Sequence, residues 1–391
     1  MSHDWSQWKL IQDFFQIGED GTMPEGTRLL MEAMEMVPYQ NKEDIVVVDA
    51  PADDGMYIIL EGDARVLDRQ GNLINELTTG DMVGELALIK DVVRGATVQA
   101  KGEVRCAHIS RPLFEKIAGK NRKVYGALLD LLYTKTTNMV RERERLQSEL
   151  AIAARIQTGF LPKSFEEFGR LPHTAVTGRM VPAKAVGGDF YDVFFIDDTR
   201  LGFLVADVSG KGIGAALFMT MAKIHIRNYM RLNMSMEEMA RRVNKQLNDD
   251  NEEELFVTAF ICVLDTKENR LDFINAGHNK PFVSRQGGDF QMLDCKANFV
   301  LGMMEPMPYN RQTIQLEPGD AIYLYTDGVS EAMNQSGELF GEERMLAALN
   351  TEPKLKENPD GLVEHMYQKI EEFAQGAEQS DDITMVYLFR G

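Results

Sequence analysis

The sequence predicts a multidomain protein of the α+β class, in which a strand-rich domain, a helical linker and a larger mixed domain follow one another. Short apolar strand patterns separated by Gly and Asp run from about residue 45 to 109, and a helical pattern follows over about 112–161. Beyond residue 174, strand-like segments come in runs with helices grouped between them. That order is typical of α+β folds and differs from a strict βαβ alternation.

Composition indicates an ordinary globular protein with an excess of acid. Hydrophobic residues make up 44% of the 391 residues and charged residues 26%, and 42 Lys and Arg stand against 61 Asp and Glu, a net charge of −19. Nucleic-acid binding needs a basic face, so we expect no nucleic-acid partner. No apolar run approaches the ~20 residues of a membrane span, and the first residues lack a signal-peptide core, so we expect no membrane association.

Cysteine usage points to a reducing compartment. The three cysteines, Cys106, Cys262 and Cys295, are widely spaced and form no CxxC pair. We therefore expect reduced thiols in a cytoplasmic protein, without a disulfide framework or a zinc site.

The first part of the chain predicts a small β-barrel or β-roll of the jelly-roll type. Residues 1–40 look helical, and short strands follow at IVVV (45–48), MYIIL (56–60), ARVLD (64–68) and ATVQA (96–100). Several short strands at such spacing are typical of these architectures.

The helical segment carries an imperfect heptad pattern. Apolar or small residues recur every seven positions at Leu132, Met139, Leu146, Ala153 and Phe160. Arg143 and Gln157 interrupt the seam, and Pro162 ends the helix. The pattern favours a parallel coiled coil that makes a homodimer through the linker; a solitary amphipathic connector is the alternative.

The informative residues of the last part are aspartates at the ends of apolar strands. They are Asp189 in VGGDFYD, Asp207 in VADVSGKG, Asp327 in LYTDGVSEA, and Asp381 and Asp382 in SDDITMV. Clusters of carboxylates select hard cations such as Mg²⁺ or Mn²⁺. Each motif alone is also a common turn, but their occurrence together favours a metal site.

These motifs resemble the PPM (protein phosphatase 2C-like) family, in its bacterial SpoIIE/RsbU-type branch. GGDFYD, ADVSGKGIGAALFM, NAGHNKP, LYTDGVSEA and DDIT stand in the family's order over about residues 152–390. The resemblance implies an αββα sandwich and two metal ions held by Asp189, Asp207, the carbonyl of Val208, Asp327 and Asp381. Asp382 is a further candidate, placed lower because relatives often carry Asn there.

The activity implied is hydrolysis of phosphoserine or phosphothreonine on a protein, by water that two Mn²⁺ or Mg²⁺ ions activate. The resemblance also implies an anti-sigma-factor antagonist as the substrate. Two positions differ from eukaryotic members: Ser209 replaces a His that is a candidate acid, and Lys184 stands where they place a phosphate-binding Arg. Lys184 is a candidate phosphate ligand or a solvated surface lysine. For His278, a structural role in its loop is favoured over acid catalysis.

The stretch VGELALIKDVVRGATVQA (83–100) resembles the phosphate-binding cassette of the cyclic-nucleotide-binding domain family. The resemblance covers about residues 40–118. The nucleotide-binding candidates are Gly84, Glu85, Leu86, Ala87, Arg94 and Gly95. A short helix presents N–H groups to an anion, Arg94 pairs with the cyclic phosphate and Glu85 accepts from the ribose. Gly95 has no hydroxyl for a guanine amino group, which favours cAMP over cGMP. The alternative is a sensor that has lost its ligand.

The whole sequence thus predicts a cytoplasmic phosphatase regulated by a cyclic nucleotide, with a sensor at 1–120, a linker at 121–162 and a catalytic domain at 163–391. We expect nucleotide binding to change how the linker meets the catalytic domain near Leu161. A catalytically silent scaffold that senses nucleotide and docks a partner is the alternative function. A transcription factor is disfavoured because an acidic domain, and no basic helix-turn-helix, follows the linker.

Overall fold

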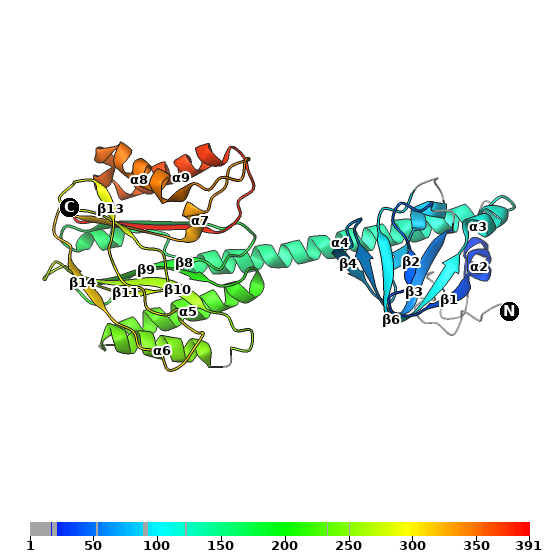
Figure 1. The fold of residues 1–391 in the computed structure, drawn as a ribbon, viewed down its shortest axis with the longest axis horizontal. Helices are drawn as coiled ribbons and strands as arrows, with labels where there is room; N and C mark the ends of the chain where they lie inside the picture. Colours follow the sequence, from blue (N-terminus) through cyan, green and yellow to red (C-terminus); the bar gives the residue numbers. More distant parts are fainter. Residues whose placement is uncertain are drawn as a thin grey trace. The chain divides into compact units, whose positions relative to one another are not determined.

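The computed structural model forms two compact units, Met1–Arg145 and Leu146–Gly391 (Figure 1). The residues it describes are 17, 22–51, 54–88, 93–121, 123–232, 234–249 and 251–391. Of the segment 1–40 predicted to be helical, residues 1–16 and 18–21 lie outside these residues, and Glu25–Glu32 form a helix, α2. The prediction is wrong for Glu35–Tyr39, which form a strand that pairs antiparallel with a later strand of the unit. The prediction of a mixed fold of helices and sheets is confirmed.

The described residues of the N-terminal unit form one sheet, in which two long strands pair with each other and with the shorter strands. The six strands are β1 (Glu35–Tyr39), β2 (Asp44–Val46), β3 (Met56–Leu67), β4 (Leu73–Leu77), β5 (Met82–Val83) and β6 (Thr97–Ile109). The segments 56–60 and 64–68, predicted as separate strands, are one strand. Register shifts around Gly62, whose φ is +87°, absorb the glycine without ending the pairing with β6.

Side chains of β3 alternate between two apolar clusters, as a strand covered on both faces requires. Met56 and Ile58 pack with Leu30 of α2 and Phe114 of α3 (Arg111–Ala118). Ile59 faces the other cluster, which fills the space inside the curved sheet. The helices therefore cover one face of the sheet.

The linker segment forms a long helix, α4 (Lys123–Phe160), of 38 residues. The helical pattern predicted over 112–161 corresponds to two helices, α3 and α4, with Gly119 directly after the end of α3. The side chains of Leu132 and Met139 lie outside the described part of the chain. Of the other heptad residues, Leu146 and Phe160 are about half exposed.

The C-terminal unit contains two five-stranded sheets whose neighbouring strands run antiparallel. The first has the order β14 (Gln312–Gln315), β11 (Arg270–Ala276), β10 (Val257–Asp265), β9 (Arg200–Val208) and β8 (Phe190–Phe195). The second has the order β13 (Phe290–Met292), β12 (Phe282–Ser284), β15 (Ala321–Tyr325), β16 (Ile383–Phe389) and β7 (Ala175–Val181).

Helices cover the outer faces of both sheets (Figure 1). Against the first sheet lie α5 (Ile213–Arg231) and α6 (Met236–Asn248), and against the second lie α8 (Gly341–Thr351) and α9 (Pro359–Ala374). Between the sheets is an apolar core to which Phe203 and Val386 contribute. Among the described helices, none combines the length and hydropathy of a membrane span.

Candidate active site

Two candidate aspartates lie side by side at the ends of two neighbouring strands of the first sheet. Phe190 of β8 pairs with Ala206 of β9, so Asp189, just before β8, lies opposite Asp207 near the end of β9. The Asp189 side chain is only 2% exposed. The antiparallel register thus brings together two carboxylates that are 18 residues apart in the sequence.

The second sheet contributes the other three aspartates in the same way. Tyr325 at the end of β15 pairs with Met385 of β16. Asp327 follows β15 and opens the short helix α7 (Asp327–Ser330), and Asp381 and Asp382 immediately precede β16. Because β15 and β16 are antiparallel, the end of β15 lies beside the start of β16, and Asp327 therefore lies near Asp381 and Asp382.

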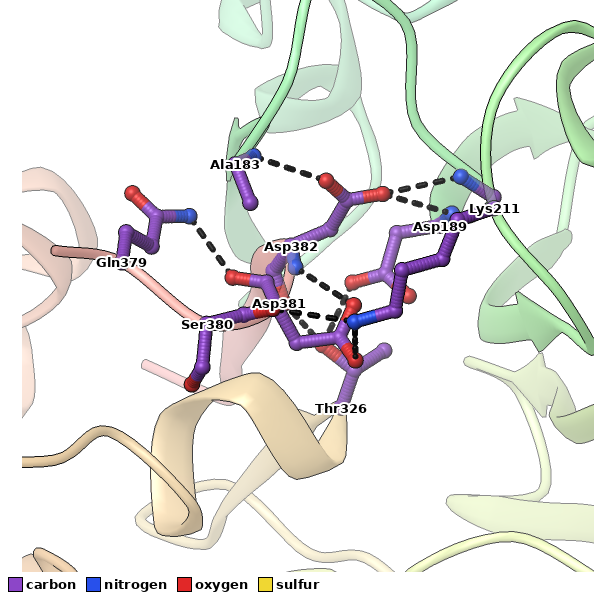
Figure 2. A network of polar contacts seen from close by, with 9 residues as sticks. Ala183, Asp189, Lys211, Thr326, Gln379, Ser380, Asp381 and Asp382 are labelled. Carbon is purple, nitrogen blue, oxygen red and sulfur yellow. Dashed lines mark hydrogen bonds and ion pairs between the residues drawn. The ribbon is translucent and has the colours of Figure 1, made fainter. Parts of the chain in front are cut away.

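A threonine joins the strand ends of the two sheets. The hydroxyl of Thr326 donates to Oδ2 of Asp189 at 2.6 Å (Figure 2). It also accepts from the backbone N–H of Thr384 at 3.1 Å. Thr326 is fully buried. This bond holds the aspartates of the first sheet against the strand ends of the second.

Negative charge is concentrated at this junction. Burial, followed by the charges of Asp207 and Asp382, raises the pKa of Asp189 well above its usual range. Burial, followed by the charge of Asp327, raises the pKa of Asp207 to about 7, and the pKa of Asp327 is raised mainly by burial as well. Carboxylates that are costly to ionise together attract a cation.

Asp382 uses its carboxylate to hold a loop. Its oxygens accept from the backbone N–H groups of Ala183 and Gly188, each at 2.8 Å, and from Asp189 at 3.4 Å (Figure 2). A Cβ on Gly187 would lie 2.1 Å from Oδ2 of Asp382, so this position requires glycine. Its contacts favour a positioning role over the metal ligation expected of it.

Sequence reasoning missed Lys211. Its ammonium donates to Oδ2 of Asp381 at 2.8 Å and to the carbonyl of Ser380 at 2.9 Å (Figure 2). The hydrogen bond to Asp381 raises the pKa of Lys211. The signal was available: a lone cation stands between two glycines, four residues after Asp207 and just before a helix.

A cavity of about 60 Å³ opens at this junction. Asp207, Lys211, Asp381 and Asp382 are among its lining residues, together with Lys184, which is exposed. The carbonyl oxygen of Val208 lies close by, because a Cβ on Gly188 would be 2.8 Å from it. The expected site residues Asp189 and Asp327 are not among the residues that line this cavity.

The donor set fits a hard cation in its chemistry, because buried carboxylate and carbonyl oxygens are the ligands that Mg²⁺ and Mn²⁺ prefer. As arranged, however, no three His, Cys, Asp or Glu side chains in the described part of the chain form a ready ligand group. The ammonium of Lys211 is the cation that pairs with Asp381 in this arrangement.

His278 lies in the core, away from the cavity lining. Its ring accepts at Nδ1 from the Thr258 hydroxyl, 2.8 Å away, and Nε2 lies 3.0 Å from the carbonyl of Tyr325. A carbonyl can only accept, so Nε2 carries the proton. Asn275 bonds the backbone of His278 on both sides, and burial lowers the pKa of His278 to about 4. These contacts favour the structural role.

In the N-terminal unit, Arg94 is buried and already has an anionic partner. Its guanidinium pairs with the carboxylate of Asp54 and donates to the carbonyl of Gly55 at 2.6 Å. Gly84 packs so closely that a Cβ there would lie 1.7 Å from Nη1 of Arg94. Asp54 was not foreseen as a partner.

The other candidate nucleotide-binding residues lie before and after Arg94 in the sequence. Glu85 opens a 3₁₀ helix (Glu85–Leu88) and is half-buried, and Gly95 is exposed with open space around it. The side chains of Leu86 and Ala87 lie outside the described part of the chain.

Comparison with known families agrees with both halves of the fold. The family described as Stage II sporulation protein E (SpoIIE) matches residues 197–390, and the family described as cyclic nucleotide-binding domain matches residues 36–121.

Curated relatives match more than half of the chain. Protein IcfG of Synechocystis sp. (strain ATCC 27184 / PCC 6803 / Kazusa) is 29% identical over 62% of this chain and 41% of its own length. Phosphoserine phosphatase RsbU of Bacillus subtilis (strain 168) is 28% identical over 63% of this chain and 72% of its own. The chain thus spans less than half of IcfG and a larger part of RsbU.

A solved structure shares the fold of the C-terminal unit. The SiaA-PP2C domain of Pseudomonas aeruginosa superposes with a TM-score of 0.53 at 23% identity, over 64% of this chain and 98% of that domain. Residues 197–390 therefore match the SpoIIE family within a unit that has the PP2C fold, and residues 36–121 match the cyclic nucleotide-binding domain family.

Proposed function

We propose that the chain is a protein phosphatase that hydrolyses phosphoserine or phosphothreonine on a protein substrate. The observation that carries this proposal is the convergence of five aspartates from two sheets, with raised pKa values at Asp189, Asp207 and Asp327. A site that accumulates negative charge in this way needs divalent cations before a phosphate can approach. The names of the relatives RsbU and RsbP, both phosphoserine phosphatases, support the same activity.

As ligands for two Mn²⁺ or Mg²⁺ ions we propose Asp189, Asp207, Asp327, Asp381 and the carbonyl of Val208. Bound ions supply an activated water and neutralise charge on the phosphoryl oxygens. Both aspartates of the first sheet are positioned by the register of β8 and β9, and the Thr326 hydroxyl orients the Asp189 carboxylate.

The remaining residues position the loop and meet the substrate. Asp382 fixes the backbone of residues 183–189, and the glycines of that loop let a phosphate come close. Lys184, exposed at the cavity, is placed to contact a phosphate oxygen. The Ser209 hydroxyl accepts from the backbone N–H of Phe256 at 2.9 Å, so we assign protonation of the leaving group to water.

For the N-terminal unit we propose a β-roll sensor that binds a cyclic nucleotide, with cAMP favoured, through Gly84, Glu85, Leu86, Ala87, Arg94 and Gly95. The cyclic phosphate would compete with Asp54 for Arg94, because both anions are attracted to the same guanidinium charge. Ligand binding and a local rearrangement are therefore coupled.

The finer organisation follows from these two assignments. We propose the division 1–120, 121–162 and 163–391, a homodimer through a coiled coil of α4, an αββα sandwich as the catalytic domain, and an anti-sigma-factor antagonist as the substrate. The described cysteines are buried and free, in keeping with a cytoplasmic protein.

The test is hydrolysis of a phosphoserine peptide by the full chain in Mn²⁺, with and without cAMP, beside the variant Asp207→Asn. We expect metal-dependent turnover that Asp207→Asn abolishes and cAMP changes. Turnover that ignores cAMP would overturn the regulatory half only. A folded protein without turnover under any metal or nucleotide would establish the silent scaffold instead.

A further inference from the structure

One polar side chain near the end of α4 is buried although its neighbours are exposed. Gln157 is 7% exposed, whereas Ile156 before it is 57% exposed and Thr158 after it is also exposed. Gln157 is one of the two residues that interrupt the heptad seam. A buried amide in a helix needs partners for both its donor and its acceptor.

Both partners belong to a single residue of the aspartate loop. Nε2 of Gln157 donates to the carbonyl of Gly187 at 2.6 Å, and the N–H of Gly187 donates to Oε1 of Gln157 at 3.1 Å. The side-chain amide therefore pairs with Gly187 as a neighbouring strand would. Two bonds to one residue fix its orientation as well as its position.

Gly187 is held from its other side by Asp382. A Cβ on Gly187 would lie 2.1 Å from Oδ2 of Asp382, and that same oxygen accepts from the N–H of Gly188 at 2.8 Å. Gly187 is thus clamped between a helix residue and an acid at the start of β16. Asp189, a proposed metal ligand, is only two residues further along the chain.

Glutamine suits this position for a chemical reason. Its amide offers one donor and one acceptor on the same rigid plane, which matches the carbonyl and the N–H of a peptide residue. Glutamate keeps the length but has no donor when ionised, and leucine has neither group. Either replacement is compatible with the helix, but neither can form both hydrogen bonds to Gly187.

We propose that Gln157 is a positioning residue for the metal site: by pairing with Gly187 it sets the loop that carries Asp189, and it ties the end of α4 to that loop. The inference rests on the proposed function, because it assumes that Asp189 binds a cation. The helix α4 begins at Lys123 in the N-terminal unit and ends three residues beyond Gln157. The end of the helix that continues from the N-terminal unit is therefore hydrogen-bonded to the loop that carries Asp189.

The test measures Mn²⁺ binding by the full chain with electron paramagnetic resonance of free Mn²⁺, which does not depend on turnover. The variants are Gln157→Leu and Gln157→Glu, with Thr158→Ala as the matched control on the exposed side of the same helix turn. Loss of an outer-shell partner typically weakens metal binding about 10- to 100-fold. We expect a weakening of that order in both Gln157 variants, with Thr158→Ala unchanged.

Thermal unfolding separates positioning from general destabilisation. Gln157→Glu preserves side-chain volume, so we expect it to fold; if Gln157→Leu unfolds, the Glu variant alone decides. Wild-type Mn²⁺ affinity in a folded Gln157→Glu protein overturns the inference, provided that Asp207→Asn has lost Mn²⁺ binding. If the unmodified chain and Asp207→Asn bind Mn²⁺ equally, the proposed function itself has failed.

Discussion

The carboxylate of Asp54 pairs with the guanidinium of Arg94, the residue expected to hold a cyclic phosphate. Arg94 is 5% exposed, and it also donates to the carbonyl of Gly55. The N-terminal unit therefore contains its own anion beside Arg94, and under the proposed function a cyclic phosphate competes with that anion for the guanidinium. Affinity then depends on the difference between the two pairings.

Replacing the internal anion should strengthen nucleotide binding. In Asp54→Asn the arginine keeps a neutral neighbour but no competing charge, so we expect cAMP to bind roughly tenfold more tightly, measured by isothermal titration calorimetry. Asp49→Asn is the control, because Asp49 pairs with Arg69 at an exposed position. Unchanged or weaker binding in Asp54→Asn would contradict this competition.

The two neighbouring acids Asp381 and Asp382 should differ in what their loss does. Asp382→Asn leaves backbone N–H groups of Ala183 or Gly188 without their acceptor, so we expect the metal-free protein to lose about 1–3 kcal/mol of unfolding free energy. Asp381→Asn, at a more exposed position, should change metal-free stability little and Mn²⁺ binding strongly. Urea unfolding and Mn²⁺ titration check the pair; equal stability losses would show that the assignments are wrong.

Removing the ammonium that pairs with Asp381 should strengthen Mn²⁺ binding and weaken substrate binding. In Lys211→Met the carboxylate of Asp381 no longer has a positive partner, so we expect Mn²⁺ to bind a few-fold more tightly, of the order of one surface charge pair. The KM for a phosphopeptide should rise, since a cation near the phosphate is lost. A mutation of exposed Lys280 serves as the control; weaker Mn²⁺ binding in Lys211→Met would count against competition for Asp381.

Stability should depend on pH through His278. Burial lowers its pKa from 6.5 to about 4, so between these values the unfolded chain binds more protons than the folded chain. Stability therefore falls as pH is lowered through this window, and from pH 7 to pH 5 we expect a loss of about 2 kcal/mol from this group.

Urea unfolding at both pH values checks this expectation. His278→Gln should reduce the pH dependence, whereas His225→Gln, at a partly exposed position of α5, should keep it. An unaltered slope in His278→Gln would assign the effect to other groups.

Much of the site could be predicted because strand patterns place residues at sheet edges. The apolar strands expected beside Asp189, Asp207 and Asp381 are present as β8, β9 and β16. Once β8 and β9 are antiparallel neighbours, Asp189 and Asp207 must meet, and the pairing of β15 with β16 does the same for Asp327, Asp381 and Asp382. Local sequence contains that information.

The pairing of residues and strands that lie far apart in the sequence could not be predicted, because no local pattern specifies which distant segments come into contact. Strand β7 pairs with β16 about 200 residues later, and neither it nor helix α8 stood out in the sequence. Lys211 has no local feature that selects Asp381 as its partner. Gln157 was visible as a flaw in the heptad seam, but its partner Gly187 was not.

The last strand has a consequence for how the protein is made. Because β16 lies between β15 and β7, and Asp381 and Asp382 directly precede it, a chain still being translated lacks both acids and the strand that joins its neighbours. Under the proposed function, a nascent chain that ends at residue 380 lacks the proposed metal ligand Asp381 and does not hydrolyse phosphate. The proposed site is complete only after β16 has left the ribosome and paired with β15 and β7.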